Sequence, residues 1–372
     1  MSFQPLAGVR VLDFTAMPPG GLCTLFLADQ GAEVIRVEAP ADKGKPSLVV
    51  RQVALSRGKR SLTLDQRNPA SIDILRRLAR TVDVVVETAK PGAMEARGFG
   101  YSQARAENPR LVWCSITGFG QTGPYAERPG HDLSYLAHSG LLGALKSDLP
   151  WQPDISLSLQ AGALAAVIGI QGALLQRERT GEGCHLDISL SEAATWLLTC
   201  GINPLSDRPY AIPSSPDRRL YECADGRFVA VASAERRTWD ALCDGLGLAD
   251  LKPALHQAEQ ADNTAQALAD TFRTRPAAEW VERLSAAGAA VTLVNHASQV
   301  LDDPQVQARG SVVQCADTPA PANPVRVMGP DGSRSQTNLT PPVLVGDDTT
   351  AVLASAGFTE AEIADLAAAG LI

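Results

Sequence analysis

Residues 8–40 read GVRVLDFTAMPPGGLCTLFLADQGAEVIRVEAP, and this stretch decides the fold class. Its first β-branched run ends in Asp13 and is typical of a parallel strand buried on both faces. A Pro/Gly turn and an apolar-periodic helix follow, and Gly31 stands near the position where a helix-terminating glycine is common. The run EVIRVEAP predicts the next strand. These segments together predict a βαβ unit with a right-handed crossover.

The same alternation continues through the first half of the chain. Strands are predicted in RSLTLD, VDVVVET and RLVWCSITGFG, and a helix in SIDILRRLART. Repeated βα units predict an α/β fold with a doubly wound parallel sheet, which is Rossmann-like, and binding chemistry at the carboxyl ends of its strands. The first turn lacks a GxGxxG pattern, so the fold class by itself does not indicate a nicotinamide cofactor.

The second half predicts a different organisation. Residues 161–179 predict a long helix of small residues, and residues 201–219, rich in Pro, Ser and Asp, predict a linker. A smaller α+β domain follows, which begins with a strand pair around the turn signal Asp225-Gly226. Residues 317–342 are Pro-rich and expected to be extended, and Thr359 is the expected N-cap of a terminal helix.

Composition narrows the class of protein. The chain has 372 residues, 45% apolar and 20% charged, which is ordinary for a soluble protein, and its net charge of -8 argues against nonspecific nucleic-acid binding. The seven cysteines form no CxxC pair, so neither a zinc site nor a disulfide framework is predicted. The N-terminus lacks a signal-peptide pattern, and residues 161–175 are too short and too rich in Gly and Ala to predict a membrane span. We expect a cytoplasmic enzyme without a metal or a separate cofactor.

Several blocks in order resemble the family III CoA-transferases (CaiB/BaiF), and most closely their α-methylacyl-CoA racemase branch. The resemblance runs from about residue 6 to residue 310 and is weak at the C-terminus. PGHDLSYLAHSGLL and YECADGRFVAVASAE resemble the racemase branch more than the transferases proper. The blocks are PLAGVRVLDF (5–14), LADQGAEVIRVEAP (27–40), LSRGKRSLTLD (55–65), GFGQTGP (118–124), PGHDLSYLAHSGLL (129–142) and YECADGRFVAVASAE (221–235).

The resemblance implies an overall organisation. It implies a large CoA-binding domain over residues 1–200 and 325–372, the linker over 201–219, and a small domain over 220–324. It also implies an interlocked homodimer, in which each active site lies between the large domain of one chain and the small domain of the other. The expected partner is an acyl-CoA substrate, with no nucleic acid and no membrane.

A basic run stands out in this acidic chain, and its members are Arg51, Arg57, Lys59 and Arg60. Arginine and lysine give charge-assisted hydrogen bonds to phosphate oxygens, although such runs are usually solvated surface. The resemblance favours coenzyme A binding, with Arg36 at the end of a strand as a further member. Lys90 and Arg97 are weaker candidates for the same pocket.

The glycine-rich segment GFGQTGP follows a predicted strand. Gly118 and Gly120 would let the backbone approach a ligand closely and present N–H groups to it. Such groups would stabilise the enolate that develops when an α-proton leaves a thioester. The alternative is a tight turn whose exit is set by Pro124, and the resemblance favours a role in the CoA site.

His131, in the segment PGHD, is the candidate acid–base residue, because imidazole exchanges protons near neutral pH. In the racemases the matching histidine works with a glutamate from the small domain, and Glu235 stands at that place here. The alternative for Glu235 is an ordinary surface glutamate that opens a helix. Asp132 is expected to fix the loop or the ring rather than to act as a base.

One residue that the resemblance implies is missing. The racemases use an aspartate as the second acid–base group, and the transferases use it as their nucleophile, but here Ser158 occupies that position in PDISLSLQAGAL. Asp154 lies four residues earlier. Three interpretations follow: Asp154 substitutes for the aspartate; the enzyme is one-sided, with Ser158 only hydrogen-bonding; or the chain is an inactive, CoA-ester-binding partner of a paralogue.

The first hypothesis is a racemase-like enzyme that moves the α-proton of an acyl-CoA thioester with His131 and Glu235. A CoA-transferase acting between carboxylic acids is the second, and a non-catalytic subunit of a heteromer is the third. The acyl group cannot be read from the sequence.

Overall fold

Six parallel strands form the largest sheet, in the order β3-β2-β1-β4-β5-β6. The computed structural model describes residues 4–15, 17–46, 53–145, 152–200 and 215–372. The strand order reverses between β1 and β4, as in doubly wound folds, so the predicted fold class is confirmed. The strands are β1 (Arg10–Asp13), β2 (Glu33–Glu38), β3 (Lys59–Thr63), β4 (Val84–Glu87), β5 (Val112–Thr117) and β6 (His185–Ser189).

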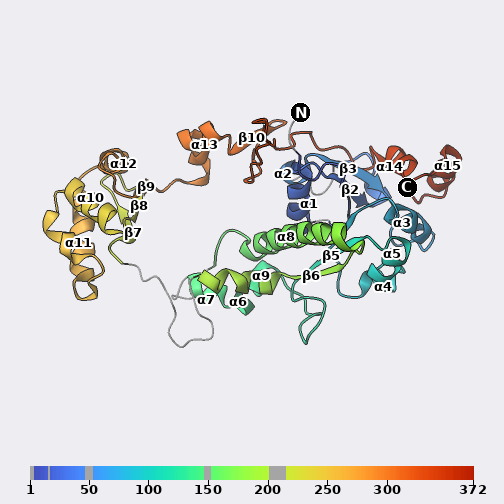
Figure 1. Ribbon diagram of the computed structural model, residues 1–372, viewed down its shortest axis with the longest axis horizontal. Coiled ribbons are helices and arrows are strands. Elements are labelled where there is room, and N and C mark those ends of the chain that lie inside the picture. The colour runs from blue at the N-terminus through green and yellow to red at the C-terminus, as the bar shows by residue number, and fades with distance from the viewer. Residues whose placement is uncertain (1–3, 16, 47–52, 146–151, 201–214) are drawn as a thin grey trace. The chain divides into compact units, whose positions relative to one another are not determined.

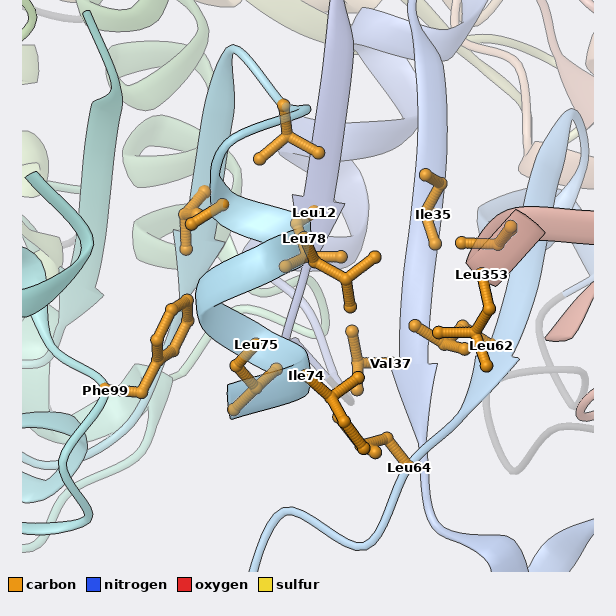
Figure 2. Packing of buried hydrophobic residues seen from close by; sticks show 14 of the residues in the cluster. Leu12, Ile35, Val37, Leu62, Leu64, Ile74, Leu75, Leu78, Phe99 and Leu353 are labelled. Atoms are coloured by element: carbon orange, nitrogen blue, oxygen red, sulfur yellow. The ribbon is translucent and has the colours of Figure 1, made fainter. Parts of the chain in front are cut away.

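Alternate residues of these strands enter two different cores, one on each face of the sheet. In β1, Leu12 belongs to one core and Val11 to the other. Figure 2 shows the first core, where Leu12 and Ile35 meet Leu75 and Leu78 of α3. Because side chains alternate along a strand, a run such as EVIRVE serves both faces when helices cover both.

Helices cover both faces. On one face lie α3, α5, α14 and α15, and on the other lie α1 and α8. Gly31 follows the C-cap of α1 with a φ of 99°, as the sequence predicts. The helices described before residue 200 are α1 (Gly20–Asp29), α2 (Val53–Ser56), α3 (Ser71–Ala79), α4 (Ala93–Ala96), α5 (Tyr101–Glu107), α6 (Asp132–Ser139), α7 (Leu141–Leu145), α8 (Leu157–Thr180) and α9 (Leu190–Trp196), and α14 (Thr349–Ser355) and α15 (Glu360–Ala368) come from the C-terminal segment.

The long helix α8 begins four residues before the predicted start. By length and composition it is the one described helix that could cross a membrane, and 44% of its apolar window is buried. Ala166, Val167 and Ile170 pack in the core that α8 shares with the sheet, whereas Leu164 and Ile168 are exposed. Helix α8 therefore packs one side against the sheet, as the core helices of α/β proteins do.

The chain divides into two units, Met1–Pro204 with Gly310–Ile372, and Leu205–Arg309. The second unit has its own core, in which Tyr221, Trp239, Phe272 and Trp280 are buried. Its antiparallel sheet has the order β7-β8-β9, and the predicted turn lies between its first two strands. Its elements are β7 (Arg218–Glu222), β8 (Phe228–Ala232), α10 (Arg236–Leu246), α11 (Ala261–Phe272), α12 (Ala277–Ala286), β9 (Val291–Leu293) and α13 (Pro304–Arg309).

The C-terminal segment returns to the first unit, but earlier than predicted. Residues 310–324, assigned from the sequence to the small domain, group with the first unit, because the hairpin of β10 (Val312–Cys315) and β11 (Thr318–Pro321) packs on α2. Arg57 also donates to the Pro321 carbonyl at 3.3 Å. Of the predicted linker, residues 201–214 lie outside the described residues, and β7 already begins at Arg218.

Figure 1 shows the red helices α14 (Thr349–Ser355) and α15 (Glu360–Ala368) beside the blue elements β2, β3 and α3. Thr359 caps α15 as predicted, accepting a hydrogen bond from Glu362 N at 3.2 Å. The short 3-10 helices are η1 (Pro40–Asp42), η3 (Leu197–Cys200), η4 (Ala249–Ala254), η5 (Ala258–Gln260) and η6 (Ala297–Asp302).

The division into units predicts that a fragment of residues 205–309 folds by itself. It should unfold cooperatively on heating, because its core is separate, and the fluorescence of the buried Trp239 and Trp280 should report the transition. A fragment of residues 205–324 is the matched control and should have the same midpoint. A clearly higher midpoint of thermal unfolding for the longer fragment would show that residues 310–324 belong to the small domain.

Candidate functional site

The candidate catalytic residue His131 is the N-cap of α6, the helix that follows the glycine-rich loop after β5. Its side chain is exposed, while the backbone around it is held closely. The His131 carbonyl accepts a hydrogen bond from Ser134 N at 2.8 Å, and the Tyr135 hydroxyl donates to the Gly130 carbonyl at 2.6 Å. An accessible imidazole on a fixed backbone is suited to exchanging protons with a bound substrate.

Asp132 links α6 to the first turn of α8. Its Oδ1 accepts hydrogen bonds from Ser158 N at 2.9 Å, Ser158 Oγ at 2.5 Å and Leu159 N at 3.3 Å. The carboxylate thereby satisfies amides that a helix start otherwise leaves unpaired, and its charge is favoured at that end of the helix. Asp132 thereby holds the start of α6 to the start of α8.

Ser158 is fully buried, with 0% of its surface exposed. Its hydroxyl is directed to Asp132, so the structure gives this serine a hydrogen-bonding role and no open path to a ligand. Asp154 is exposed and lies in a bend before α8, rather than on a preceding helical turn. The substitution of Asp154 for the missing aspartate stays a prediction.

Glu235 is the N-cap of α10 in the second unit. It lies at a helix start, and Thr238 Oγ1 donates to its Oε2 at 3.1 Å. This arrangement is the one expected of a glutamate that opens a helix. Its pairing with His131, which belongs to the first unit, stays a prediction.

The loop of residues 118–124 packs against α6 and β6. A Cβ at Gly118 would lie 2.4 Å from the Tyr135 ring, and Gly120 has a φ of 88°, so both positions require glycine. Gln121 N donates to both carboxylate oxygens of Asp187 at 3.0 Å. This amide of the loop is therefore engaged within the protein and is not free to bind an enolate.

His138, two turns along α6 from His131, is held by polar and aromatic contacts within the first unit. Its Nδ1 lies 2.6 Å from Ser191 Oγ, and its ring packs edge-on against Phe119 and Tyr125. Ser191 N in turn donates to the Gly118 carbonyl at 3.0 Å. His138 thus ties the glycine-rich loop to α6 and α9.

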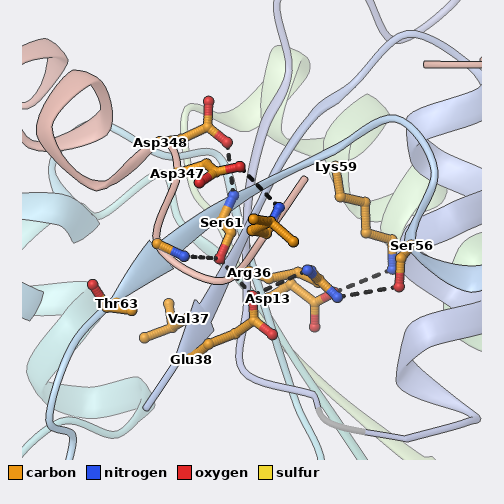
Figure 3. A network of polar contacts seen from close by, with 12 residues as sticks. Asp13, Arg36, Val37, Glu38, Ser56, Lys59, Ser61, Thr63, Asp347 and Asp348 are labelled. Carbon is orange, nitrogen blue, oxygen red and sulfur yellow. Dashed lines mark hydrogen bonds and ion pairs between the residues drawn. The ribbon is translucent and has the colours of Figure 1, made fainter. Parts of the chain in front are cut away.

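Figure 3 shows that cations of the predicted CoA cluster face internal partners. Lys59 Nζ donates to Thr24 Oγ1 at 2.6 Å and lies 3.4 Å from Asp13 Oδ2. Burial lowers the pKa of Lys59, and the Asp13 charge opposes this effect. Arg36 pairs with Glu38 at 3.0 Å and is 2% exposed.

Arg57 is also buried and pairs with Asp29 at 2.7 Å. Burial raises the pKa of the Asp29 carboxyl, and the Arg57 charge opposes the rise. Because a buried charge needs a partner of opposite sign, these ion pairs give Arg36, Arg57 and Lys59 a structural reason to be present. Their contact with CoA phosphates stays a prediction.

The remaining cations of the prediction are more accessible. Arg60 is partly exposed and pairs with Glu33 and Asp348. Lys90 and Arg97 are exposed and flank α4, beyond the end of β4. Arg51 lies outside the described residues.

An open pocket of about 580 Å³ lies beyond the carboxyl ends of β2 and β3. Arg97 lines it, together with Arg67, Asp65 and Gln66. The two guanidinium groups belong to exposed residues, which suits an anionic ligand. Arg67 was not predicted, although the rule that strand ends carry binding sites could have indicated the turn after β3.

The described residues contain no group of three or more His, Cys, Asp or Glu side chains that could hold a metal ion. Free thiols are carried by Cys23, Cys114, Cys184, Cys223, Cys243 and Cys315.

Comparison with known proteins settles the family. A model described as CoA-transferase family III matches residues 6–349. The chain belongs to this family. α-Methylacyl-CoA racemase from Homo sapiens is 30% identical over 373 residues, covering 97% of this chain and 96% of the racemase. Acetyl-CoA:oxalate CoA-transferase from Acetobacter aceti is 31% identical over 360 residues, covering 88% and 90% of the two chains.

Solved structures agree with this assignment. The crystal structure of a CaiB/BaiF family protein from Brucella suis matches with a TM-score of 0.81 at 27% identity, covering 96% of this chain and 100% of that one. Relatives that are racemases and relatives that are CoA-transferases show about the same identity to this family III chain. The family indicates an enzyme that acts on CoA thioesters, and it does not decide between the two reactions.

The contact between Gly118 and Tyr135 predicts that Gly118→Ala destabilises the protein by about 1–3 kcal/mol, because the added methyl group overpacks against the ring. Thermal unfolding measures the change. Gly172→Ala is the matched control, since it adds the same methyl group within α8 with nothing within 4 Å, and it should be neutral or slightly stabilising. Equal stability of the two variants would mean that Tyr135 moves aside freely.

The ion pair of Lys59 predicts that Lys59→Met destabilises the protein by about 3–5 kcal/mol, because the Asp13 carboxylate is left buried without its cation. The expected result is a midpoint of thermal unfolding several degrees lower. Arg97→Gln, at an exposed position, should leave the midpoint unchanged. The double variant Asp13→Asn/Lys59→Met should recover part of the lost stability. A double variant whose loss of stability equals the sum of the losses of the two single variants would argue against a stabilising ion pair.

Proposed function

We propose that this family III protein exchanges the α-proton of an acyl-CoA thioester, as a racemase or epimerase, with His131 as a catalytic base. The observation that carries the proposal is the exposed imidazole at the start of α6, on a backbone held by Ser134 and Tyr135. The similarity to α-methylacyl-CoA racemase over 97% of the chain supports it.

The reaction requires a base within reach of the proton on the α-carbon, and hydrogen-bond donors that stabilise the enolate. His131 takes the α-proton onto a ring nitrogen while the C–H electrons move toward the thioester carbonyl. Return of a proton to the same carbon completes the exchange. Glu235 is proposed to orient the ring, and the backbone of residues 118–120 to face the enolate oxygen.

Coenzyme A is proposed to bind at the carboxyl ends of the strands. The pocket that Arg67 and Arg97 line offers two accessible cations for phosphate groups, and the exposed Lys90 precedes α4, which Arg97 follows. No separate cofactor and no metal take part in the proposed reaction.

CoA transfer between two carboxylic acids is the second candidate. It is favoured by the carboxylate of Asp132, which stands next to His131 and could attack a thioester as a nucleophile. Acetyl-CoA:oxalate CoA-transferase is as similar to this chain as the racemase is. Transfer of CoA to added oxalate or succinate, detected by mass spectrometry, distinguishes the two reactions.

We also propose a homodimer in the cytoplasm. Leu164, Ile168 and Leu175 form an exposed apolar row on α8, at spacings that share a helix face, and Trp196 of α9 is 72% exposed. Such residues are suited to contact with a second copy of the chain. A heteromer with a paralogue is the alternative to this homodimer.

The proposal predicts that His131→Ala loses α-proton exchange by at least about 100-fold, because the base is removed. Deuterium incorporation at C2 of 2-methylacyl-CoA in D2O, followed by NMR, measures the exchange. Affinity for the thioester should stay within about twofold of the unchanged protein. His296→Ala, at an exposed histidine of the second unit, is the matched control and should retain full exchange.

Survival of exchange in His131→Ala would show that another group is the base. Absence of exchange in the unchanged protein, combined with CoA transfer to a second acid, would replace the proposal with the transferase. Thioester binding without either reaction would favour the non-catalytic subunit.

A further inference from the structure

A two-base racemisation uses one proton-exchanging group on each face of the α-carbon, and His131 is the proposed group on one face. Ser158 is a poor second group, because its side chain is buried and its hydroxyl already donates to Asp132. A serine hydroxyl also needs a separate base before it can accept a proton from carbon. The second group must therefore be sought among the carboxylates near His131.

Asp132 is the neighbouring carboxylate, and its two oxygens differ. Three donors from the start of α8 converge on Oδ1. Oδ2 has no hydrogen-bond partner among the residues that the structure describes, and Asp132 is partly exposed. One oxygen thus fixes the carboxylate, and the other is left to exchange a proton.

The neighbourhood supports this division. Asp132 follows His131 directly, so the two Cα atoms are about 3.8 Å apart and both side chains arise at the start of α6. The Ser158 hydroxyl and the two amides hold the carboxylate without neutralising it, since each is an uncharged donor. Asp187 of β6, a carboxylate beside the glycine-rich loop, uses both oxygens to accept a hydrogen bond from Gln121 N.

We propose that Asp132 is the second acid–base residue of the exchange, acting through Oδ2, with Ser158 as a positioning residue. This inference rests on the proposed function. In one direction the Asp132 carboxylate takes the α-proton, and the His131 imidazolium gives a proton to the opposite face of the enolate. In the other direction neutral His131 takes the α-proton and the carboxylic acid of Asp132 returns one, and exchange with water resets both groups between turnovers.

The test uses the full-length protein and each enantiomer of 2-methylacyl-CoA separately in D2O, with deuterium entry followed by NMR and configuration by chiral analysis. In Asp132→Asn the amide oxygen can still accept the three hydrogen bonds, so the start of α8 stays capped while the carboxylate is lost. The expected result is racemisation at least about 100-fold slower, with deuterium entering only the enantiomer that His131 deprotonates and with configuration retained. Affinity for the thioester should stay within about threefold.

Ser158→Ala is the matched control, because it removes the hydroxyl donor and keeps the carboxylate. It should slow racemisation by less than about tenfold and leave exchange from both enantiomers. The double variant Asp132→Asn/Ser158→Asp places a carboxylate at position 158, whose hydroxyl donates to Asp132 in the unchanged protein. Partial recovery of racemisation is expected. A purely structural role of Asp132 would not give this recovery.

Racemisation by Asp132→Asn within about threefold of the unchanged protein overturns the inference and leaves the proposed function standing. Exchange with retained configuration in the unchanged protein also overturns the inference, and it reduces the proposed function to a one-sided α-proton exchange. Equal loss of exchange from both enantiomers in Asp132→Asn, with no recovery in the double variant, also overturns the inference, since this result indicates a structural role. Absence of exchange in the unchanged protein overturns the proposed function and the inference together.

Discussion

The ion pair of Lys59 with Asp13 inside the first unit joins the start of β3 to the end of β1. The lysine comes from β3 and the aspartate from β1, so the contact crosses β2, and Thr24 of α1 joins both partners. Removing these charges from water is costly unless each hydrogen bond is made, which restricts how β1, β3 and α1 can be arranged. The arrangement of these three elements is therefore set by a buried polar network as well as by apolar packing.

The sequence predicted the central strands well, because β1, β2, β4 and β5 are buried on both faces and read as largely apolar runs of the right length. Thr359 and Gly31 were found from local capping patterns, which depend on a few neighbouring residues. The boundary near residue 310 was missed, because the hairpin of β10 and β11 is assigned by its packing on α2, and a Pro-rich segment carries no signal for that contact.

The candidate site was only partly predictable. His131 and the glycine-rich loop were found from motifs, but the partners that decide their chemistry lie far away in the chain. Asp132 and Ser158 are 26 residues apart, and Lys59 and Asp13 are 46 apart. A basic run looks the same in the sequence whether its charges face phosphate or internal carboxylates. Glu235 lies in the other unit, and its assignment still rests on the resemblance alone.

Tyr135 connects two parts of the site that the sequence presents as separate motifs. Its ring lies against Gly118 and its hydroxyl holds the Gly130 carbonyl, immediately before His131. A backbone shift at residue 118 would therefore be transmitted through one rigid side chain to the proposed base. During evolution the loop and the histidine would have to change together, and new acyl specificity would more readily arise from residues outside this contact.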